Sequence, residues 1–424
     1  MIVGESSSAF PHLPLRQGRD KERRGPSRGL LRQSVMSSRN LILILAVSGF
    51  ASTFSARAVE PMVGVIARDL SSTPQTIALL AAAFALPYAF IQPVLGPIGD
   101  ALGKERVMKV ALSLLFLALA GSFFAPNAET LFGLRIIAGA AAGGAVPLSI
   151  ALIGDRVEMA QRQVALSRYL VAIIVGQLAG SSLAGLLAEW IGWRGVFGLS
   201  TAMMACALAA TVIGFRGALP GGKFDPRTAI LRYREILSNP RALFLFGSVF
   251  VEAVAVFAIF PYVAPLLEER GGGGATEAGF AIGGFAIGGL VYSALVGWML
   301  KHLGISRMLL GGGLFAAAAL VALGFAGDWK LDFVALLLMG LGFYMLHNTF
   351  QAQVTEVAPG ARASAVALHA FSFFCGQALG VVLMGFGLRH IGLTASTIAA
   401  ALVILGVGLT ASIVLRRPTS QRAR

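Results

Sequence analysis

Two stretches with the same spacing decide the fold of this 424-residue chain. Residues 96–106 read GPIGDALGKER and residues 297–307 read GWMLKHLGISR, so glycine, an ionisable residue, glycine and arginine recur at identical intervals 201 residues apart. A second pair, GQLAG at 176–180 and GQALG at 376–380, recurs 200 residues apart. Self-similarity at one fixed offset indicates a duplicated structural unit. The chain is therefore predicted to contain two related halves.

The sequence around these stretches is strongly apolar. Hydrophobic residues make up 56% of the chain and charged residues only 13%, with a mean hydropathy of +0.78, whereas soluble domains carry about 25% charged residues. Crossing a bilayer takes about 20 consecutive apolar helical residues. Twelve stretches of that kind are predicted: 41–66, 77–98, 107–125, 130–153, 165–188, 194–215, 242–263, 275–299, 307–326, 332–354, 363–388 and 392–415.

One long connection divides these spans into six and six. It runs from Arg216 to Arg241 and contains Pro220 and Gly221, whereas the other connections are short. We predict an all-α integral membrane protein with twelve transmembrane helices, arranged as two pseudo-symmetric six-helix bundles around a central cavity. The predicted segments are a basic, disordered cytoplasmic tail (1–39), an N-terminal bundle (40–216), a cytoplasmic linker (217–241), a C-terminal bundle (242–416) and a cytoplasmic tail (417–424).

The distribution of the formal charge of +14 predicts the topology. Of the 34 lysines and arginines, 27 fall on the side that holds both tails and five on the other. The excess of positive charge on cytoplasmic loops predicts that both termini are cytoplasmic. The basic segments lack the interleaved aromatic residues that nucleic-acid binding requires, so no nucleic-acid partner is expected.

The N-terminal segment carries no evident cleavable signal peptide, because the first apolar run begins near residue 41 and has the length of a span. Met36 directly precedes the polar flank of that span. Translation starting at Met36 and a genuine long tail starting at Met1 are both compatible with the sequence.

Three segments resemble signatures of the major facilitator superfamily. Residues 96–106 resemble its loop between spans two and three, residues 135–139 its span-four signature with Ala138 at the usual Gln position, and residues 193–197 its entry to span six. The resemblance covers about residues 40–415 and implies a transporter rather than an enzyme. Within the superfamily the chain resembles twelve-span drug:proton antiporters and predicted arabinose-efflux-like permeases, the latter through residues 347–351 with Pro359, Arg362 and Gln377.

One departure from the antiporter pattern concerns span five. Ser181 follows Gly180 where the antiporter signature has Gly-Pro, and Ala184 stands where glycine is usual. The resemblance therefore supports the fold more strongly than it supports export.

The loop after span two is predicted to form a cytoplasmic gate. Its residues are Gly96, Asp100, Gly103 and Arg106, and the Asp100 carboxylate can face Arg106 or the positive end of a neighbouring helix. The second copy of the loop carries Lys301 instead of the acid. The alternative is a turn whose charges only keep it soluble.

Four charged residues inside predicted spans are candidates for proton coupling. Arg57 and Glu60 share a helical face three residues apart, Arg135 lies in span four, and Glu252 lies near the middle of span seven. A charge in lipid is costly unless it is paired or faces water. The alternatives are headgroup positions for Arg57 and Glu60, a snorkelling Arg135 and a structural, hydrogen-bonded Glu252.

Polar residues in spans ten and eleven are candidates for substrate binding. Span ten contributes His347, Asn348 and Gln351, and span eleven contributes His369 and Ser372. Polar stripes of this kind also join helices to one another, so a structural role stays open.

The remaining motifs exclude several classes of function. The sequence contains no phosphate-binding P-loop, no HExxH and no GxSxG, and its two cysteines have no metal-ligand spacing, so no cofactor or metal is expected. The predicted partners are a small-molecule substrate, protons and membrane lipid, and a monomer is expected. We predict proton-coupled efflux by alternating access at the cytoplasmic (inner) membrane. The alternatives are proton-coupled or facilitative uptake of a sugar or organic acid, and a non-transporting sensor or scaffold.

Overall fold

The computed structural model describes residues 38–215, 226–358 and 361–416, which are helical and contain no β-strand. The all-α prediction is thus confirmed for this part of the chain. The helices, η denoting a 3-10 turn, are α1 (Ser38–Arg57), η1 (Glu60–Met62), α2 (Val63–Asp69), α3 (Pro74–Leu102), α4 (Lys104–Phe123), α5 (Ala128–Ala142), α6 (Ala145–Arg156), α7 (Met159–Gly214), α8 (Pro226–Leu237), α9 (Pro240–Val256), η2 (Phe260–Tyr262), α10 (Val263–Arg270), α11 (Ala275–Phe325), α12 (Trp329–Val357), α13 (Arg362–His390) and α14 (Gly392–Val414).

Ten helical segments of the described chain are long and apolar enough to cross a membrane. Two of them, in α7 and α11, are 51 residues long, more than twice the length that one crossing needs. Gly192 interrupts α7 and Gly304 interrupts α11, each with a positive φ. The ten segments can therefore accommodate the twelve predicted spans, since each long helix bends back at its glycine.

The glycines at the bends repeat the offset seen in the sequence. Gly103 and Gly304 have φ values of 89° and 68°, and Gly192 and Gly392 have φ values of 69° and 78°. Side chains other than glycine rarely adopt this conformation. The same turns are thus built twice, 200 or 201 residues apart.

Close helix packing also repeats between the halves. A Cβ atom added to Gly139 would lie 2.1 Å from the carbonyl oxygen of Phe84, and one added to Gly340 would lie 2.1 Å from that of Phe285. Small residues let membrane helices approach this closely. The two pairs of positions are related by the 201-residue offset, so α3 crosses α5 as the first part of α11 crosses α12.

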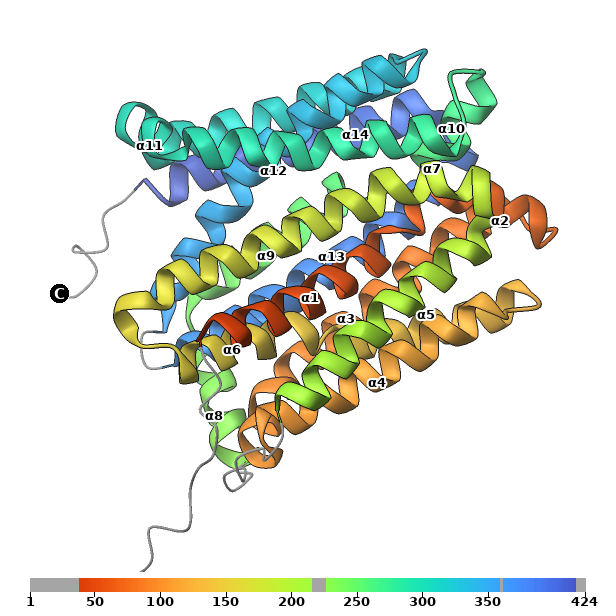
Figure 1. Cartoon of the computed structure of the whole chain (residues 1–424). Helices are drawn as coiled ribbons and strands as arrows, with labels where there is room; N and C mark the ends of the chain where they lie inside the picture. The colour runs from red at the N-terminus through yellow and green to blue at the C-terminus, as the bar shows by residue number, and fades with distance from the viewer. Residues whose placement is uncertain (1–37, 216–225, 359–360, 417–424) are drawn as a thin grey trace, which may run out of the picture. The chain divides into compact units, whose positions relative to one another are not determined.

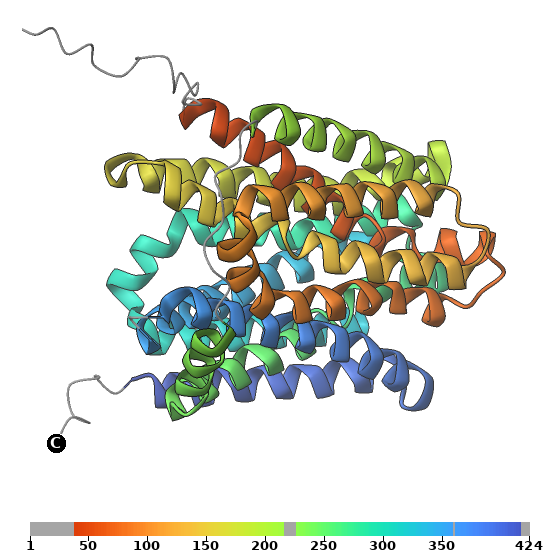
Figure 2. The same ribbon diagram turned by 90° about the horizontal axis from the view of Figure 1, so that it is seen from below.

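Helices of the two halves also pack against one another. Helix α3 packs along α13 and α7 packs along α11, and in both views the long helices run alongside one another (Figure 1 and Figure 2). The ring centroids of Tyr88 and Phe374 are 4.0 Å apart across the first of these interfaces. Figure 1 places α2 and α10 at one end of the helices and α8 at the other.

The segment predicted as the cytoplasmic linker contains a helix. Helix α8 lies within 217–241, and the hydroxyl of Tyr233 donates a hydrogen bond of 2.6 Å to the carbonyl oxygen of Pro93 in α3. The predicted N-terminal tail up to residue 37, residues 217–225 of the linker and the tail at 417–424 lie outside the described residues.

Candidate functional site

A buried ion pair lies where α1 gives way to η1. The Nη1 atom of Arg57 donates a 2.7 Å hydrogen bond to Oε1 of Glu60, and the side chain of Glu60 is only 4% exposed. Pro61, which follows, has no backbone N–H and fits the first turn of η1. The Oε2 atom of Glu60 is buried and has no hydrogen-bond partner among the described residues.

Arg135 approaches the same break from α5. Arg135 is 1% exposed, and its two terminal nitrogens donate hydrogen bonds to the carbonyl oxygens of Ser55 and Ala56, at 3.3 and 3.5 Å. The guanidinium carbon lies 4.3 Å from the centroid of the Phe84 ring, a cation–π geometry. Arg135 thus ties α5 to the end of α1 beside Glu60.

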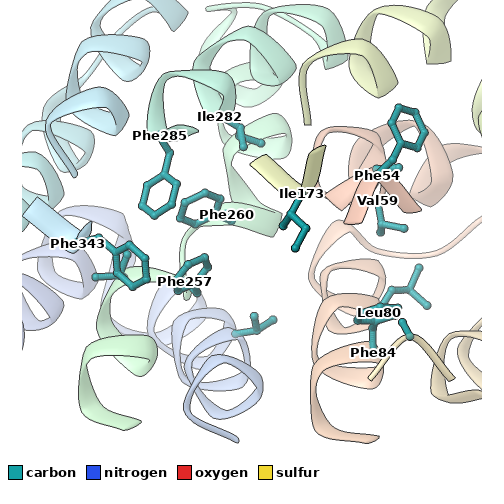
Figure 3. Packing of buried hydrophobic residues seen from close by; sticks show 14 of the residues in the cluster. Phe54, Val59, Leu80, Phe84, Ile173, Phe257, Phe260, Ile282, Phe285 and Phe343 are labelled. Atoms are coloured by element: carbon teal, nitrogen blue, oxygen red, sulfur yellow. The ribbon is translucent and has the colours of Figure 1, made fainter. Parts of the chain in front are cut away.

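Aromatic residues of the second half, among them Phe257 and Phe260, lie together in the buried core (Figure 3). The guanidinium carbon of Arg57 lies 4.9 Å from the ring centroid of Phe257 and 5.9 Å from that of Phe260. Phe257 and Phe260 follow Arg57 and Glu60 by 200 residues. A charged pair in one half therefore faces an aromatic pair at the equivalent positions of the other half.

A cavity between the halves includes this ion pair. Its polar lining consists of Arg57 and Glu60 together with Gln177 and Ser181 of α7, and Tyr344 of α12. The enclosed space has room for about one water molecule. In this conformation the halves must separate before a solute can occupy the cavity.

A second polar cluster lies entirely in the C-terminal half. Glu252 of α9 is fully buried, and its Oε2 atom lies 3.1 Å from Nδ1 of His347 in α12. The ring of His369 from α13 has its centroid 5.2 Å from that of His347. Within the described residues, Oε1 of Glu252 and Nε2 of His369 lack hydrogen-bond partners. Three helices thus bring one acid and two imidazoles together, with Glu252 and His369 buried and the side chain of His347 16% exposed.

Aromatic rings separate the two polar sites. Phe257, which stacks on Arg57, packs against Phe343 at 5.2 Å between centroids, and Phe343 stacks on His347 at 4.8 Å. Phe373 contacts both Phe257 and His347, at 5.3 and 4.9 Å. The Arg57–Glu60 ion pair and the Glu252 cluster therefore lie on opposite sides of a layer of aromatic rings that contacts both.

The other predicted substrate residues lie apart from the acid. Asn348 and Ser372 are half-buried, and Gln351 is exposed. Within the described structure, no side-chain hydrogen bond or ion pair joins these three residues to Glu252 or Arg57. The structure thus groups His347 and His369 with the predicted coupling acid rather than with Asn348, Gln351 and Ser372.

The predicted gate loop is described only in part. Gly96 and Asp100 lie in α3, and the Asp100 side chain falls outside the described structure. Gly103 forms the turn to α4, and Arg106 is exposed. The interaction between Asp100 and Arg106 therefore stays a prediction.

Two ion pairs beside this loop are not predicted by the sequence. Lys104 contacts Asp155 at 2.7 Å, and Glu105 pairs with Arg156, so the start of α4 is joined to the end of α6. Each pair joins positions 51 residues apart, which no local pattern reveals.

Contacts between the halves close the end that carries α2 and α10. Arg68 pairs with Glu268, its equivalent at the 200-residue offset, and Glu189 accepts a hydrogen bond of 3.2 Å from the backbone N–H of Thr276. A Cβ atom on Gly185 would lie 2.1 Å from the carbonyl oxygen of Ala275. In the sequence Arg68 is only one of the charges that set the topology, and no local pattern marks Glu268 as its partner.

Reversing one charge of this contact is expected to open this end. Arg68→Glu places two carboxylates together, and because the pair is partly exposed, the effect is about 1 kcal/mol, or about a fivefold change in population. We would measure the rate at which a thiol reagent labels Ser182→Cys, after replacing Cys206 and Cys375 by serine. The rate should rise several-fold.

The double reversal Arg68→Glu with Glu268→Arg should restore the slow labelling. Lys330→Glu, at an exposed position in the first turn of α12, is the matched control and should leave the rate unchanged. Fast labelling in the double variant contradicts a role for this pair in closure. A rise in Lys330→Glu as large as that in Arg68→Glu contradicts it as well.

Comparisons with known proteins agree with this architecture. The family model described as Major Facilitator Superfamily matches residues 45–368 and 245–424. The chain is 32% identical over 190 residues to a "Multi-drug resistance efflux pump PmrA homolog" of Lactococcus lactis, covering 43% of this chain and 45% of that relative. It is 24% identical over 369 residues to an uncharacterized MFS-type transporter, YybF, of Bacillus subtilis, covering 82% and 87%.

Two solved structures share the fold at low sequence identity. The nucleoside transporter NupG has a TM-score of 0.71, with 89% of this chain and 99% of that chain covered, and the peptide transporter POT has a TM-score of 0.74, with 89% and 94% covered. Each is 15% identical to this chain. The family match across the chain confirms the predicted resemblance: this protein is a multi-pass membrane transporter of the major facilitator superfamily, and not an enzyme.

Proposed function

We propose that this transporter exports a small organic solute in exchange for protons, and that Glu252 carries the proton. The observation that carries the proposal is the burial of the Glu252 carboxylate against His347, with its second oxygen lacking a partner in the described structure. A buried acid without a compensating cation is costly in its ionised form. Such a group changes charge when water or a counter-charge reaches it.

The Arg57–Glu60 pair is the proposed contact for the solute. It lines the cavity between the halves, and Oε2 of Glu60 is an acceptor without a partner among the described residues. A solute with a hydrogen-bond donor can satisfy that oxygen, while the rings beside Arg57 provide apolar surface. Arg135 holds the end of α1 in place through the carbonyl oxygens of Ser55 and Ala56.

Alternating access supplies the cycle that couples the two sites. The described conformation is closed at the α2 and α10 end by Arg68–Glu268 and by the approach of Gly185 to Ala275. Opening this end requires the halves to separate, which would also widen the cavity around Arg57. In the proposed cycle Glu252 takes up a proton when its surroundings become wet on the acidic side and releases it on the other.

The proposed setting is the cytoplasmic membrane, with both termini in the cytoplasm and the protein acting as a monomer. The charge asymmetry of the connections supports this orientation. Asp100 and Arg106 are proposed to close the cytoplasmic side. Export is supported by the similarity of part of the chain to a protein named as a multidrug efflux pump homolog.

Flux measurements on purified protein in vesicles test this function. Compounds that accumulate less in cells expressing the protein are chosen first, and their uptake into inside-out proteoliposomes is followed with and without an imposed pH gradient. We expect accumulation only when the lumen is acidic. Accumulation that ignores the gradient contradicts proton coupling, and movement in the opposite sense under the same gradient supports uptake.

A further inference from the structure

A basic cavity of about 900 Å³ lies at one end of the C-terminal half. It is formed by the start of α9, the bend of α11 at Gly304, and residues of α12 and the end of α14. Its charged lining residues are Arg241, Arg307 and Arg416, and its described lining contains no acidic residue. Three positive charges around one cavity attract an anion.

Polar groups beside the arginines also line the cavity. Arg241 donates to the side-chain oxygen of Gln353, which is neutral, and Ser306 donates a 2.7 Å hydrogen bond to the carbonyl oxygen of Ser412. Arg307 and Arg416 are exposed. Arg307 and Arg416 are therefore accessible to an anion from outside the chain.

The equivalent loop of the N-terminal half balances its charges internally. At the 201-residue offset, Lys104 and Glu105 correspond to Ile305 and Ser306. In the first half, Lys104 pairs with Asp155 and Glu105 pairs with Arg156. The second copy has neither the lysine nor the acid at these positions, and Glu356, the equivalent of Asp155, pairs with Arg362 at 3.9 Å.

Apolar residues adjoin the arginines. Leu300 and Ile305 line the cavity and are 45% and 39% exposed. Trp298, on the same helix, is 59% exposed and stacks on His302. Exposed tryptophan is typical of the boundary between hydrocarbon and headgroups. The cavity therefore combines a cationic end with lipid-facing apolar surface at headgroup depth.

We propose that this cavity binds the phosphate group of an anionic phospholipid, whose acyl chains lie along Leu300 and Ile305. Basic pockets between transmembrane helices bind anionic headgroups in this way. The chain's own residues 417–424 are a poor occupant, since they contain Arg417, Arg422 and Arg424 and no acidic side chain. The cavity shares no lining residue with the Arg57 and Glu252 clusters. The proposed lipid site is therefore independent of the proposed transport mechanism.

Thermal unfolding of the purified full-length protein tests the site. The protein in a neutral detergent is titrated with phosphatidylglycerol, phosphatidylcholine or inorganic phosphate, and the midpoint of the rise in Tm is recorded. We expect phosphatidylglycerol to raise Tm at concentrations where the other two do not. In the double variant Arg307→Gln with Arg416→Gln the midpoint should shift to about tenfold higher concentration, or more.

The matched control is Lys301→Gln, an exposed lysine near the cavity that does not line it. It should titrate like the parent. The single variant Arg307→Gln should shift the midpoint of the lipid titration by a smaller amount. It replaces the double variant in the test if the double variant unfolds without lipid. An equal response to phosphatidylcholine, an equal response to inorganic phosphate, or an equal loss in Lys301→Gln overturns the proposal of an anionic lipid site.

Discussion

Glu252→Gln is expected to reduce pH-driven accumulation to the level of vesicles without protein, while exchange down a concentration gradient survives. Glutamine keeps the size of the side chain and its hydrogen bond to His347 but cannot change charge. Because the bond is retained, the free energy of unfolding should change by less than about 1 kcal/mol. The two readings, flux under an imposed pH gradient and flux without one, are taken on the same vesicles.

The control for this variant is Glu235→Gln, which removes an exposed carboxylate from α8. It should transport like the parent. His347→Gln tests the same cluster by the same flux measurements, since it removes the imidazole and keeps a polar group beside Glu252. If Glu252→Gln still concentrates the solute in response to the gradient, Glu252 is structural and coupling must lie at Glu60, Arg57 or Arg135.

Gly139→Ala is expected to destabilise the protein by about 2 to 3 kcal/mol, because inserted atoms in a tight contact force the backbone apart. The added methyl would lie 2.1, 2.8 and 2.9 Å from the O, C and Cα atoms of Phe84. Backbone atoms cannot swing aside as the end of a side chain can. Gly340→Ala meets Phe285 at the same three distances, so the two variants should lose similar amounts.

Gly133→Ala is the matched control on the same helix, α5. A Cβ atom there meets nothing within 4 Å, and alanine is a better helix former than glycine by about 1 kcal/mol. Its Tm in detergent should equal or exceed that of the parent. Similar losses in Gly133→Ala and Gly139→Ala would show that the close crossing of α3 and α5 is not what limits stability.

The sequence is sufficient to predict the architecture because two of its signals do not depend on how the helices pack. Span-length apolar runs identify membrane helices without knowledge of their packing. The 200-residue repeat predicts a duplicated half, and the structure reproduces it in the turns at Gly192 and Gly392 and in the glycine contacts of Gly139 and Gly340. Glycine forms the turns because it can adopt a positive φ, and it permits the close helix contacts because it has no Cβ atom. Both properties follow from the residue type alone.

Other features depend on how the helices are rotated against one another. The sequence places Glu252 near mid-span and marks His347 and His369 as polar, yet their meeting depends on three helices turning those faces together. The same holds for Arg68 with Glu268, and for Glu105 with Arg156. Helical periodicity fixes which residues share a face but leaves open what that face meets. In lipid a polar face can turn toward a cavity or toward another helix, so only the tertiary structure decides which polar residues become partners.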